Sequence, residues 1–170
     1  ATNYFVSVLV SIKNEGLSNV RECIEYFLSQ SNIDRLTICL TELDNDHKKY
    51  LALINELKVK DSRLTHTTFS GIHGYKGEQL NVELEKIKNN TKNALVGIYD
   101  IDSRPDRKVF QYIKNNKIDV GQQFTLYDIN MCNLKPLALA GSLHQTFWTI
   151  SFEMFNFFFP NQRLVYTIGH

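Results

Sequence analysis

Five short apolar runs recur along the chain, each bounded by polar or turn-forming residues and each of a length typical of a β-strand. They cover residues 5–12, 36–40, 64–69, 94–99 and 120–126. Between the early runs lie two apolar stripes with helical spacing, one from Leu17 to Leu28 and one from Tyr50 to Leu57. Strands that alternate with helices predict an α/β fold. The nearly continuous Val, Leu and Ile of the first and fourth runs predict a mostly parallel sheet with helices on both faces and the first strand central.

Two carboxylates, Asp100 and Asp102, follow directly on the fourth run. Ligands of parallel sheets bind at the carboxyl ends of the strands, and paired carboxylates there suit Mg²⁺ or Mn²⁺ bound together with a substrate's phosphates. Both side chains point the same way if the backbone stays extended past Asp100, which Pro105 favours locally. The other interpretation is an acidic turn that caps a helix starting near Asp106.

The order of the motifs resembles the family 2 glycosyltransferases, inverting nucleotide-sugar transferases with a GT-A fold. Residues 6–15 are similar to the family's opening strand and its Asn-Glu turn, and residues 75–81 to its Gly-Lys-x-x-Ala-Leu-Asn segment. Residues 100–102 resemble its metal-binding Asp-x-Asp motif, and residues 166–170 the strand that enters the acceptor half. The resemblance spans essentially the whole chain, so we expect one nucleotide-sugar-binding domain over residues 1–170.

The resemblance implies an activity and a set of site residues. The expected reaction is a metal-assisted, inverting transfer of a sugar from a nucleotide-diphosphate sugar, first of all a UDP-sugar, to a glycan or lipid-linked acceptor in cell-surface polysaccharide biosynthesis. Asp102 is expected to bind the Mn²⁺ or Mg²⁺ directly, and Asp100 to contact ribose or the metal through water. Lys76 is expected to offer a charge to a phosphate. The expected nucleotide-sugar-binding residues are Ser11, Asn14, Glu15, Glu42, Lys76 and Asp100.

The chain departs from the family pattern in three places. The Asp-Asp-Gly-Ser stretch expected after the second strand is replaced by residues 41–44, in which Glu42 either accepts a hydrogen bond from the uracil or ribose or belongs to a solvated loop. Tyr75 stands where the family has Gly before Lys76. The acidic catalytic base and the Gln-x-x-Arg-Trp segment are expected beyond His170, so the base is unassigned. We therefore expect this chain to be the amino-terminal, nucleotide-binding part of a longer enzyme.

Charge and cysteine content bear on partners and compartment. The net charge is +1, from 19 Lys and Arg against 18 Asp and Glu, which gives no electrostatic reason to expect nucleic acid as a partner. The three cysteines, Cys23, Cys39 and Cys132, lack paired or zinc-type spacing. An odd number of cysteines favours a reducing, cytoplasmic location, and the apolar surroundings of Cys23 and Cys39 predict core positions.

An aromatic segment runs from Phe147 to Phe159 but is too short and too often interrupted to span a bilayer. It is either a helix that packs on the sheet and on later parts of the enzyme, or an interfacial helix at the inner face of the plasma membrane, where a lipid-linked acceptor would lie. The lack of Lys and Arg between Leu143 and Asn161 favours the first. In an isolated chain this apolar face is expected to form a homo-oligomer.

Two other classes of protein compete with the transferase. Phosphotransferases and phosphatases that use Asp-x-Asp usually place that motif after the first strand, whereas here it follows the fourth run. A non-catalytic fragment that binds a nucleotide or nucleotide sugar without turnover is the stronger alternative. A reading frame that continues past His170 into an acidic pair and an aromatic-Arg segment would favour the enzyme.

Overall fold

The computed structural model describes residues 4–116 and nine further helical residues, which are 136, 140, 141, 143, 144, 147, 148, 150 and 151. The chain divides into two compact units, residues 1–119 and residues 120–170. The first unit alternates strands and helices. In chain order its elements are β1 (Phe5–Ser11), α1 (Leu17–Leu28), β2 (Arg35–Thr41), α2 (His47–Lys58), β3 (Leu64–Phe69), α3 (Lys76–Asn90), β4 (Ala94–Tyr99) and α4 (Val109–Asn116).

The four strands form one sheet in the order β3-β2-β1-β4, and every neighbouring pair is parallel. β1 therefore lies between two partners, and its residues Val6 to Val10 are all buried. Two of the predicted strands, residues 64–69 and 94–99, have the bounds expected, while the first strand ends at Ser11 instead of residue 12. The α/β class, the parallel sheet and the central position of the first strand are confirmed.

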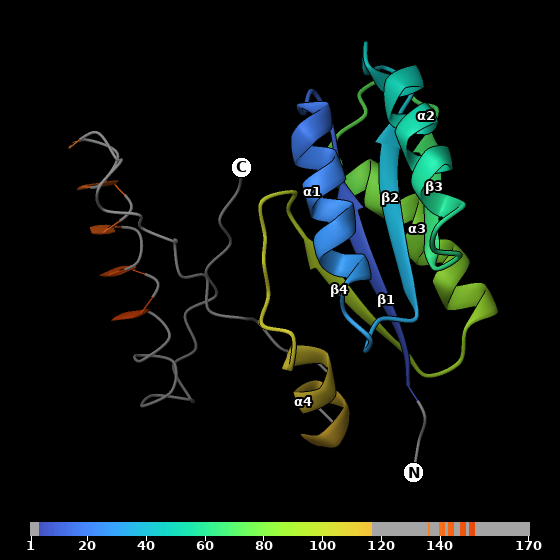
Figure 1. Cartoon of the computed structure of the whole chain (residues 1–170). Coiled ribbons are helices and arrows are strands. Elements are labelled where there is room, and N and C mark those ends of the chain that lie inside the picture. The colour runs from blue at the N-terminus through green and yellow to red at the C-terminus, as the bar shows by residue number, and fades with distance from the viewer. Residues whose placement is uncertain are drawn as a thin grey trace. The chain divides into compact units, whose positions relative to one another are not determined.

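Helices cover both faces of the sheet. α1 and α2 lie in front of it in Figure 1 and α3 lies behind. The alternation of side chains along β1 follows this arrangement, since Val8 and Val10 belong to the core with α1 and α2, whereas Leu9 packs with Leu80 and Ile87 of α3. The two predicted apolar stripes are the buried faces of α1 and α2.

The contact between α3 and the sheet is unusually polar. Glu83 of α3 is only 5% exposed, and its Oε1 accepts a hydrogen bond from the Thr37 hydroxyl at 3.3 Å. Lys86, one turn along, lies 3.7 Å from Oε2 of the same carboxylate and donates to Thr67 at 2.6 Å. A buried carboxylate is tolerated only with such partners, and this network lies beside the apolar contacts of Leu80 and Ile87.

The start of α4 agrees with the helix expected near Asp106. The Asp106 carboxylate accepts a hydrogen bond from the Lys108 N–H at 2.7 Å, and the Asp106 carbonyl accepts one from the Val109 N–H at 3.0 Å. The first contact closes a turn just before α4, and the second satisfies the N–H of its first residue, which a helix leaves free. Asp106 therefore shapes the turn that leads into α4.

Much of the carboxyl-terminal part lies outside the described residues, including the strands predicted at 120–126 and 166–170. Of the aromatic segment, residues 147, 148, 150 and 151 are described; they are helical, and Phe147 is 71% exposed. The Trp148 indole N–H donates to Nε2 of His144 at 3.0 Å, as helical spacing allows. Self-association through residues 147–159 stays a prediction. Within the described residues, no helix has both the length and the apolar content needed to cross a bilayer.

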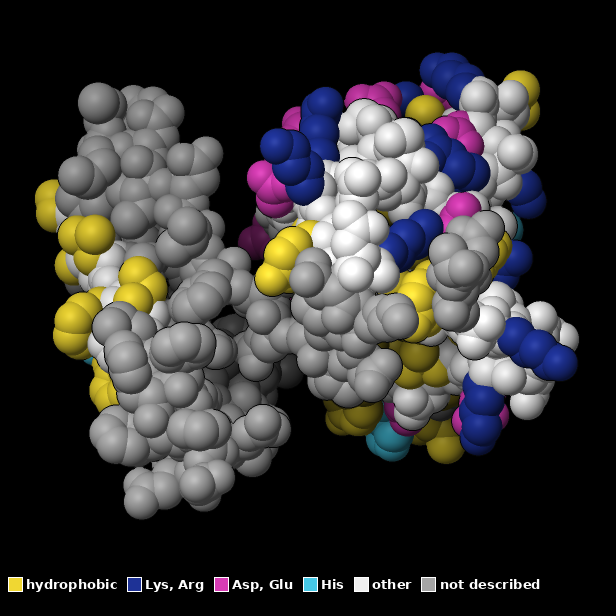
Figure 2. All heavy atoms as spheres, turned by 90° about the horizontal axis from the view of Figure 1, so that it is seen from below, with side chains coloured by type: hydrophobic (Ala, Val, Ile, Leu, Met, Phe, Trp, Pro, Cys, Tyr) yellow, Lys and Arg dark blue, Asp and Glu magenta, His cyan; other side chains and the backbone are white. Residues whose placement is uncertain are grey.

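Charged groups are mixed on the face of the molecule that Figure 2 shows. In the view from below in Figure 2, Lys and Arg side chains are scattered among acidic and uncharged groups and do not gather into one stripe. One exposed pair, Arg21 and Glu56, links α1 to α2 at 3.0 Å. Such exposed pairs contribute little to stability because solvent screens them.

Arg63, just before β3, has a different role from these surface charges. Its guanidinium donates to the carbonyl of Leu28, at the end of α1, and to those of Gln30 at 2.7 Å and Ile33 at 3.2 Å. The Asp61 carboxylate holds the guanidinium at 2.7 Å, and this hydrogen bond lowers the pKa of Asp61 below its ordinary 3.8. The stabilisation from Asp61 is thus fully present above pH 3.8 and is lost as the pH falls through the lowered pKa.

Arg63→Met should lower the free energy of unfolding by about 2–3 kcal/mol, because three buried or half-buried carbonyls lose a charged donor. Arg21→Met is the matched control, since it removes an arginine that also pairs with a carboxylate but lies exposed; it should destabilise the chain much less than Arg63→Met. Urea unfolding of both variants measures the difference. Equal losses would contradict the role given to Arg63.

The two described cysteines are buried, as predicted, at 1% exposure for Cys23 and 0% for Cys39. Burial raises the pKa of the Cys23 thiol to about 11 and that of Cys39 to about 12. In a Cys132→Ser variant, therefore, neither remaining thiol should react with Ellman's reagent at pH 8 until denaturant unfolds the chain. Rapid labelling of the native variant would show that one of these thiols is accessible.

Candidate nucleotide and metal site

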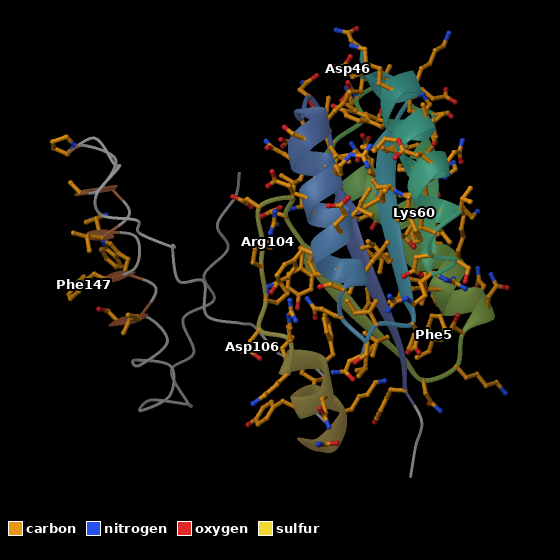
Figure 3. All side chains as sticks on the ribbon, in the orientation of Figure 1. Phe5, Asp46, Lys60, Arg104, Asp106 and Phe147 are labelled. Atoms are coloured by element: carbon orange, nitrogen blue, oxygen red, sulfur yellow. The ribbon has the colours of Figure 1, made fainter. Side chains whose placement is uncertain are left out.

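The parallel sheet brings the carboxyl ends of all four strands to one edge, which we call the ligand edge. Val10 of β1 pairs with Tyr99 of β4, so Ser11 and Asp100 are the next residues on adjacent strands. Asn14 follows Ser11 in the loop after β1. The prediction that Asp100, Ser11 and Asn14 share an edge is confirmed. In Figure 3, Asp46 marks this end of the sheet and Phe5 marks the opposite end.

The loop after β1 is fixed by a buried carboxylate. Asn14 has a left-handed backbone with φ of 57°, and its N–H donates to Oδ2 of Asp44 at 2.5 Å. The other oxygen of Asp44 accepts from the Asp46 N–H at 2.8 Å, and the residue is only 6% exposed. Asp44 therefore joins the loops after β1 and β2. Both carboxylate oxygens of Asp44 thus accept hydrogen bonds from backbone N–H groups. The side chain of Asn14 is exposed at the edge.

Tyr50 of α2 fixes the next residue of the same loop. Its hydroxyl accepts a hydrogen bond from the Glu15 N–H at 2.9 Å and donates to the Glu15 carbonyl at 2.7 Å. The ring is fully buried in the core, and burial raises the pKa of the hydroxyl. Sequence reasoning counted Tyr50 only as part of an apolar stripe. Its hydroxyl was the available signal, because a buried tyrosine hydroxyl needs a partner.

Glu42 follows the end of β2 at the ligand edge. Its N–H donates to the carbonyl of Phe69 at 3.1 Å, which extends the pairing of β2 with β3 by one bond. The side chain of Glu42 is exposed. The predicted contact with a base or ribose stays a prediction.

The loop between β3 and α3 packs closely against the end of β2. Gly74 has φ of +61°, and a Cβ placed on it would lie 2.5 Å from the Thr41 hydroxyl oxygen. The Lys13 ammonium, from the loop after β1, donates to the carbonyl of His73 at 3.2 Å. The rings of His73 and Tyr75 stack at 5.2 Å with an angle of 15° between their planes. This loop is thus held from two neighbouring elements and presents a pair of stacked, exposed rings.

Lys76 is the first residue of α3, and its ammonium forms an ion pair with Oδ1 of Asp100. The start of the helix is set by the Tyr75 N–H, which donates to the Glu78 carboxylate at 2.9 Å. The Lys76 side chain is 49% exposed and that of Asp100 is 59% exposed, so both are open to solvent. The structure therefore brings together two of the predicted site residues, from α3 and from the loop after β4.

The backbone after β4 forms an acidic turn, as in the second interpretation of these residues, and not the extended conformation of the first. The strand ends at Tyr99, and residues Asp100 to Ser103 close a turn in which the Ser103 N–H donates to the Asp100 carbonyl at 3.0 Å. The Ser103 hydroxyl also accepts from the Asp100 N–H at 3.2 Å. These two bonds prevail over the local preference that Pro105 imposes, which reaches only Arg104. Asp100 and Asp102 are both exposed within this one turn.

Arg104 braces the turn from its far side. Its guanidinium donates to the carbonyls of Ile101 at 2.8 Å and Ser103 at 2.9 Å, and lies over the Tyr26 ring of α1 at 5.3 Å. The Tyr26 hydroxyl donates to the Pro105 carbonyl at 2.6 Å. The charge of Arg104 is therefore used to hold the acidic turn against α1.

The donor set at the turn suits a metal ion that a substrate also binds. Over residues 4–116 and the nine other described positions, no three His, Cys, Asp or Glu side chains gather closely enough to hold a metal alone. Two hard carboxylates, Asp100 and Asp102, are present and accessible. Mg²⁺ and similar ions are commonly bound by one or two carboxylates with the remaining ligands from phosphates and water. Asp100 and Asp102 are therefore carboxylates of the kind that a metal site shared with a phosphate ligand uses.

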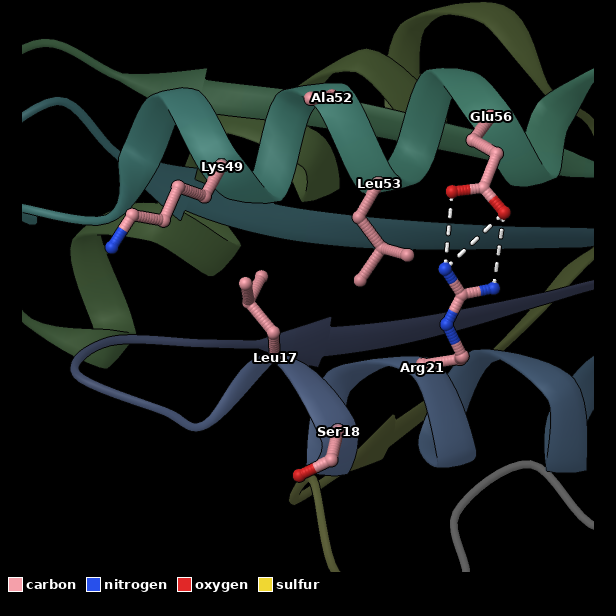
Figure 4. A pocket seen from close by; sticks show the side chains of 7 residues that line it. All are labelled: Leu17, Ser18, Arg21, Lys49, Ala52, Leu53 and Glu56. Carbon is pink, nitrogen blue, oxygen red and sulfur yellow. Dashed lines mark hydrogen bonds and ion pairs between the residues drawn. The ribbon is translucent and has the colours of Figure 1, made fainter.

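A shallow groove between α1 and α2 lies apart from these residues. It is lined by Leu17, Ser18, Arg21, Lys49, Ala52, Leu53 and Glu56. Figure 4 shows the bidentate pair of Arg21 and Glu56 across it. None of the predicted site residues lines this groove, so it is a separate feature of the helical surface.

In comparisons with known proteins, no family model and no curated protein matches the chain. The resemblance to family 2 glycosyltransferases is therefore carried by the sequence stretches themselves. The structure adds the α/β class and the parallel sheet, and membership of the family stays a prediction.

Gly74→Ala should destabilise the chain by about 1–3 kcal/mol, since the left-handed backbone and the close approach to Thr41 both oppose a Cβ. Gly77→Ala is the control three residues on, where a Cβ meets nothing within 4 Å and helix propensity favours alanine. That variant should be as stable as the wild type or up to about 1 kcal/mol more stable. Chemical unfolding of the pair tests this, and a Gly74→Ala variant as stable as Gly77→Ala would contradict it.

Proposed function

We propose that this chain is the nucleotide-binding part of a glycosyltransferase that moves a sugar from a nucleotide-diphosphate sugar to a glycan or lipid-linked acceptor, with inversion and with a divalent cation. The observation that carries the proposal is the meeting of Lys76 and Asp100 at the ligand edge. A diphosphate needs a cation from the protein, and a metal needs carboxylates. Lys76 of α3 offers such a cation and Asp100, just after β4, offers such a carboxylate, and the two side chains are in contact.

The chain's own residues have distinct parts in this proposal. Asp102 and Asp100 hold the Mn²⁺ or Mg²⁺, and Lys76 contacts a phosphate. Ser11, Asn14 and Glu15, from the end of β1 and its loop, and Glu42 from the loop after β2 face the nucleotide. When bound, the cation stabilises negative charge that grows on the leaving diphosphate.

Rigid support of these loops favours binding of a defined ligand. The loop after β1 is held by Asp44 and Tyr50, and the loop before α3 by Lys13 and by the close packing of Gly74. Residues that are positioned in advance lose less conformational entropy when a ligand arrives. The exposed side chains at the edge are therefore presented on a fixed frame.

UDP should raise the thermal stability of the full 170-residue chain when Mn²⁺ or Mg²⁺ is present, because a ligand that binds only the folded state stabilises it. At a ligand concentration about 100 times Kd, the stabilisation should be about 2.7 kcal/mol. A thermal-shift titration with Mn²⁺, and in parallel with excess chelator, measures it. Equal stabilisation in the chelator would rule out the metal.

Asp102→Asn should abolish this response, because an amide is a poor ligand for a hard cation. Asp106→Asn is the matched control in the same loop, since asparagine closes such a turn as well as aspartate does. The control should keep both the stability and the response to UDP. A retained response in Asp102→Asn would reject the assignment of the metal ligand.

The non-catalytic alternative makes the same binding predictions and differs in turnover. Residues 4–116 provide the proposed contacts to nucleotide and metal but no assigned base for the acceptor hydroxyl. Release of UDP from a UDP-sugar in the presence of acceptor, measured for this chain and for a longer reading frame, separates the two. Turnover only in the longer form would make this chain the binding part of the enzyme.

A further inference from the structure

The ion pair between Lys76 and Asp100 engages a carboxylate that the proposed metal site needs. The ammonium of Lys76 contacts Oδ1 of Asp100, and both side chains are about half exposed. A divalent cation that approaches Asp100 meets a positive charge already in place. The pair and the metal therefore compete for the same carboxylate oxygen.

The position of Lys76 gives this pair a reason to form without ligand. Lys76 is the first residue of the 15-residue helix α3, where the positive end of the helix dipole disfavours a cation. Asp100 compensates both the helix terminus and the ammonium. The other lysine of this region, Lys13, donates to backbone carbonyls at His73 and Gly74.

We propose that Lys76 is a tethered counter-ion, which weakens binding of a bare metal ion at Asp100 and releases this carboxylate when the metal arrives with a diphosphate. This inference rests on the proposed function. When the metal binds Asp100, the Lys76 ammonium loses its anionic partner. The diphosphate provides a new one, so Lys76 moves from the carboxylate to a phosphate oxygen. Metal and nucleotide then bind as a coupled pair.

The exposure of the pair makes the exchange feasible. A solvent-exposed ion pair changes the equilibrium constant of the process that breaks it by a factor of about five or less. Breaking the pair of Lys76 and Asp100 therefore lowers the affinity for the incoming ligand only slightly. A charge-assisted contact from lysine to phosphate replaces it. Coupling between two ligands is reciprocal, so the nucleotide should raise the affinity for metal by the same factor by which metal raises the affinity for nucleotide.

The test is a calorimetric titration of Mn²⁺ into the full chain without nucleotide, for wild type and Lys76→Met. Removal of the competing charge should raise the affinity for Mn²⁺ about twofold to fivefold. Lys92→Met is the matched control, because Lys92 is an exposed lysine just before the amino-terminal end of β4, away from the ligand edge. Its affinity for Mn²⁺ should equal that of the wild type.

Two further variants identify the cause of a gain. Lys76→Arg keeps the positive charge and should bind Mn²⁺ as weakly as the wild type. Asp100→Asn combined with Lys76→Met should lose the gain, because the released carboxylate is gone. The melting temperature of each variant without ligand verifies that it is folded, as half-exposed side chains should allow.

Titration of UDP in the presence of Mn²⁺ completes the test. Lys76→Met should bind UDP about threefold to tenfold more weakly than wild type, since the phosphate loses a charged partner. The factor by which UDP enhances Mn²⁺ binding should fall accordingly.

Two results would overturn the inference, and they differ in what they say of the proposed function. Equal affinity of wild type and Lys76→Met for Mn²⁺ alone rejects the counter-ion role, even where UDP binds with Mn²⁺ as proposed. Failure of UDP and of the other nucleoside diphosphates to bind the wild type with Mn²⁺ rejects the exchange and the proposed function together, whatever the titration of the metal gives.

Discussion

Parallel pairing of β1 with both of its neighbours is the constraint on which the candidate site depends. A parallel strand can be reached only by a connection that returns along the sheet, and α1, α2 and α3 provide these returns. Every strand therefore ends at the same edge. Ser11 and Asp100 lie far apart in the sequence, yet they follow paired residues of adjacent strands. A slip of the β1–β4 register by one residue would move Asp100 one position away from Ser11. It would also turn the side chains of β4 to the opposite face of the sheet.

The residues that hold the ligand edge are of a different kind from those that face outward. Asp44 and Tyr50 are buried, and both act on backbone groups of the loop after β1. Gly74 acts by having no side chain where the loop passes Thr41. Lys76 and Asp102, by contrast, are exposed. Loop shape is thus set from the interior, while the chemistry of the edge is carried by side chains that contribute little to packing.

Sequence reasoning found what depends on apolar periodicity and missed what depends on tertiary contacts. The runs at 64–69 and 94–99 and the stripes of α1 and α2 were predictable, because burial imposes a regular spacing. The shared edge of Asp100 and Ser11 followed from parallel topology alone. The turn at Asp100 was one of two interpretations that the sequence left open, since alternation along a strand does not say whether Ser103 closes back on the chain. The polar contacts of Glu83 beneath α3 were hidden, because their partners come from other elements.

A chain with almost no net charge can still have a strongly polarised site, and the ligand edge illustrates how. The Asp100 carboxylate after β4 and the Lys76 ammonium at the start of α3 meet there, so their opposite charges cancel in the sum but not in space. In water such pairs hold each other weakly, which leaves each charge available to a ligand that offers a better partner. Such an edge selects ligands that offer a positive charge to the carboxylate and a negative charge to the ammonium at the same time. A metal alone or an anion alone satisfies only one sign, whereas the metal–diphosphate complex of the proposed function would satisfy both.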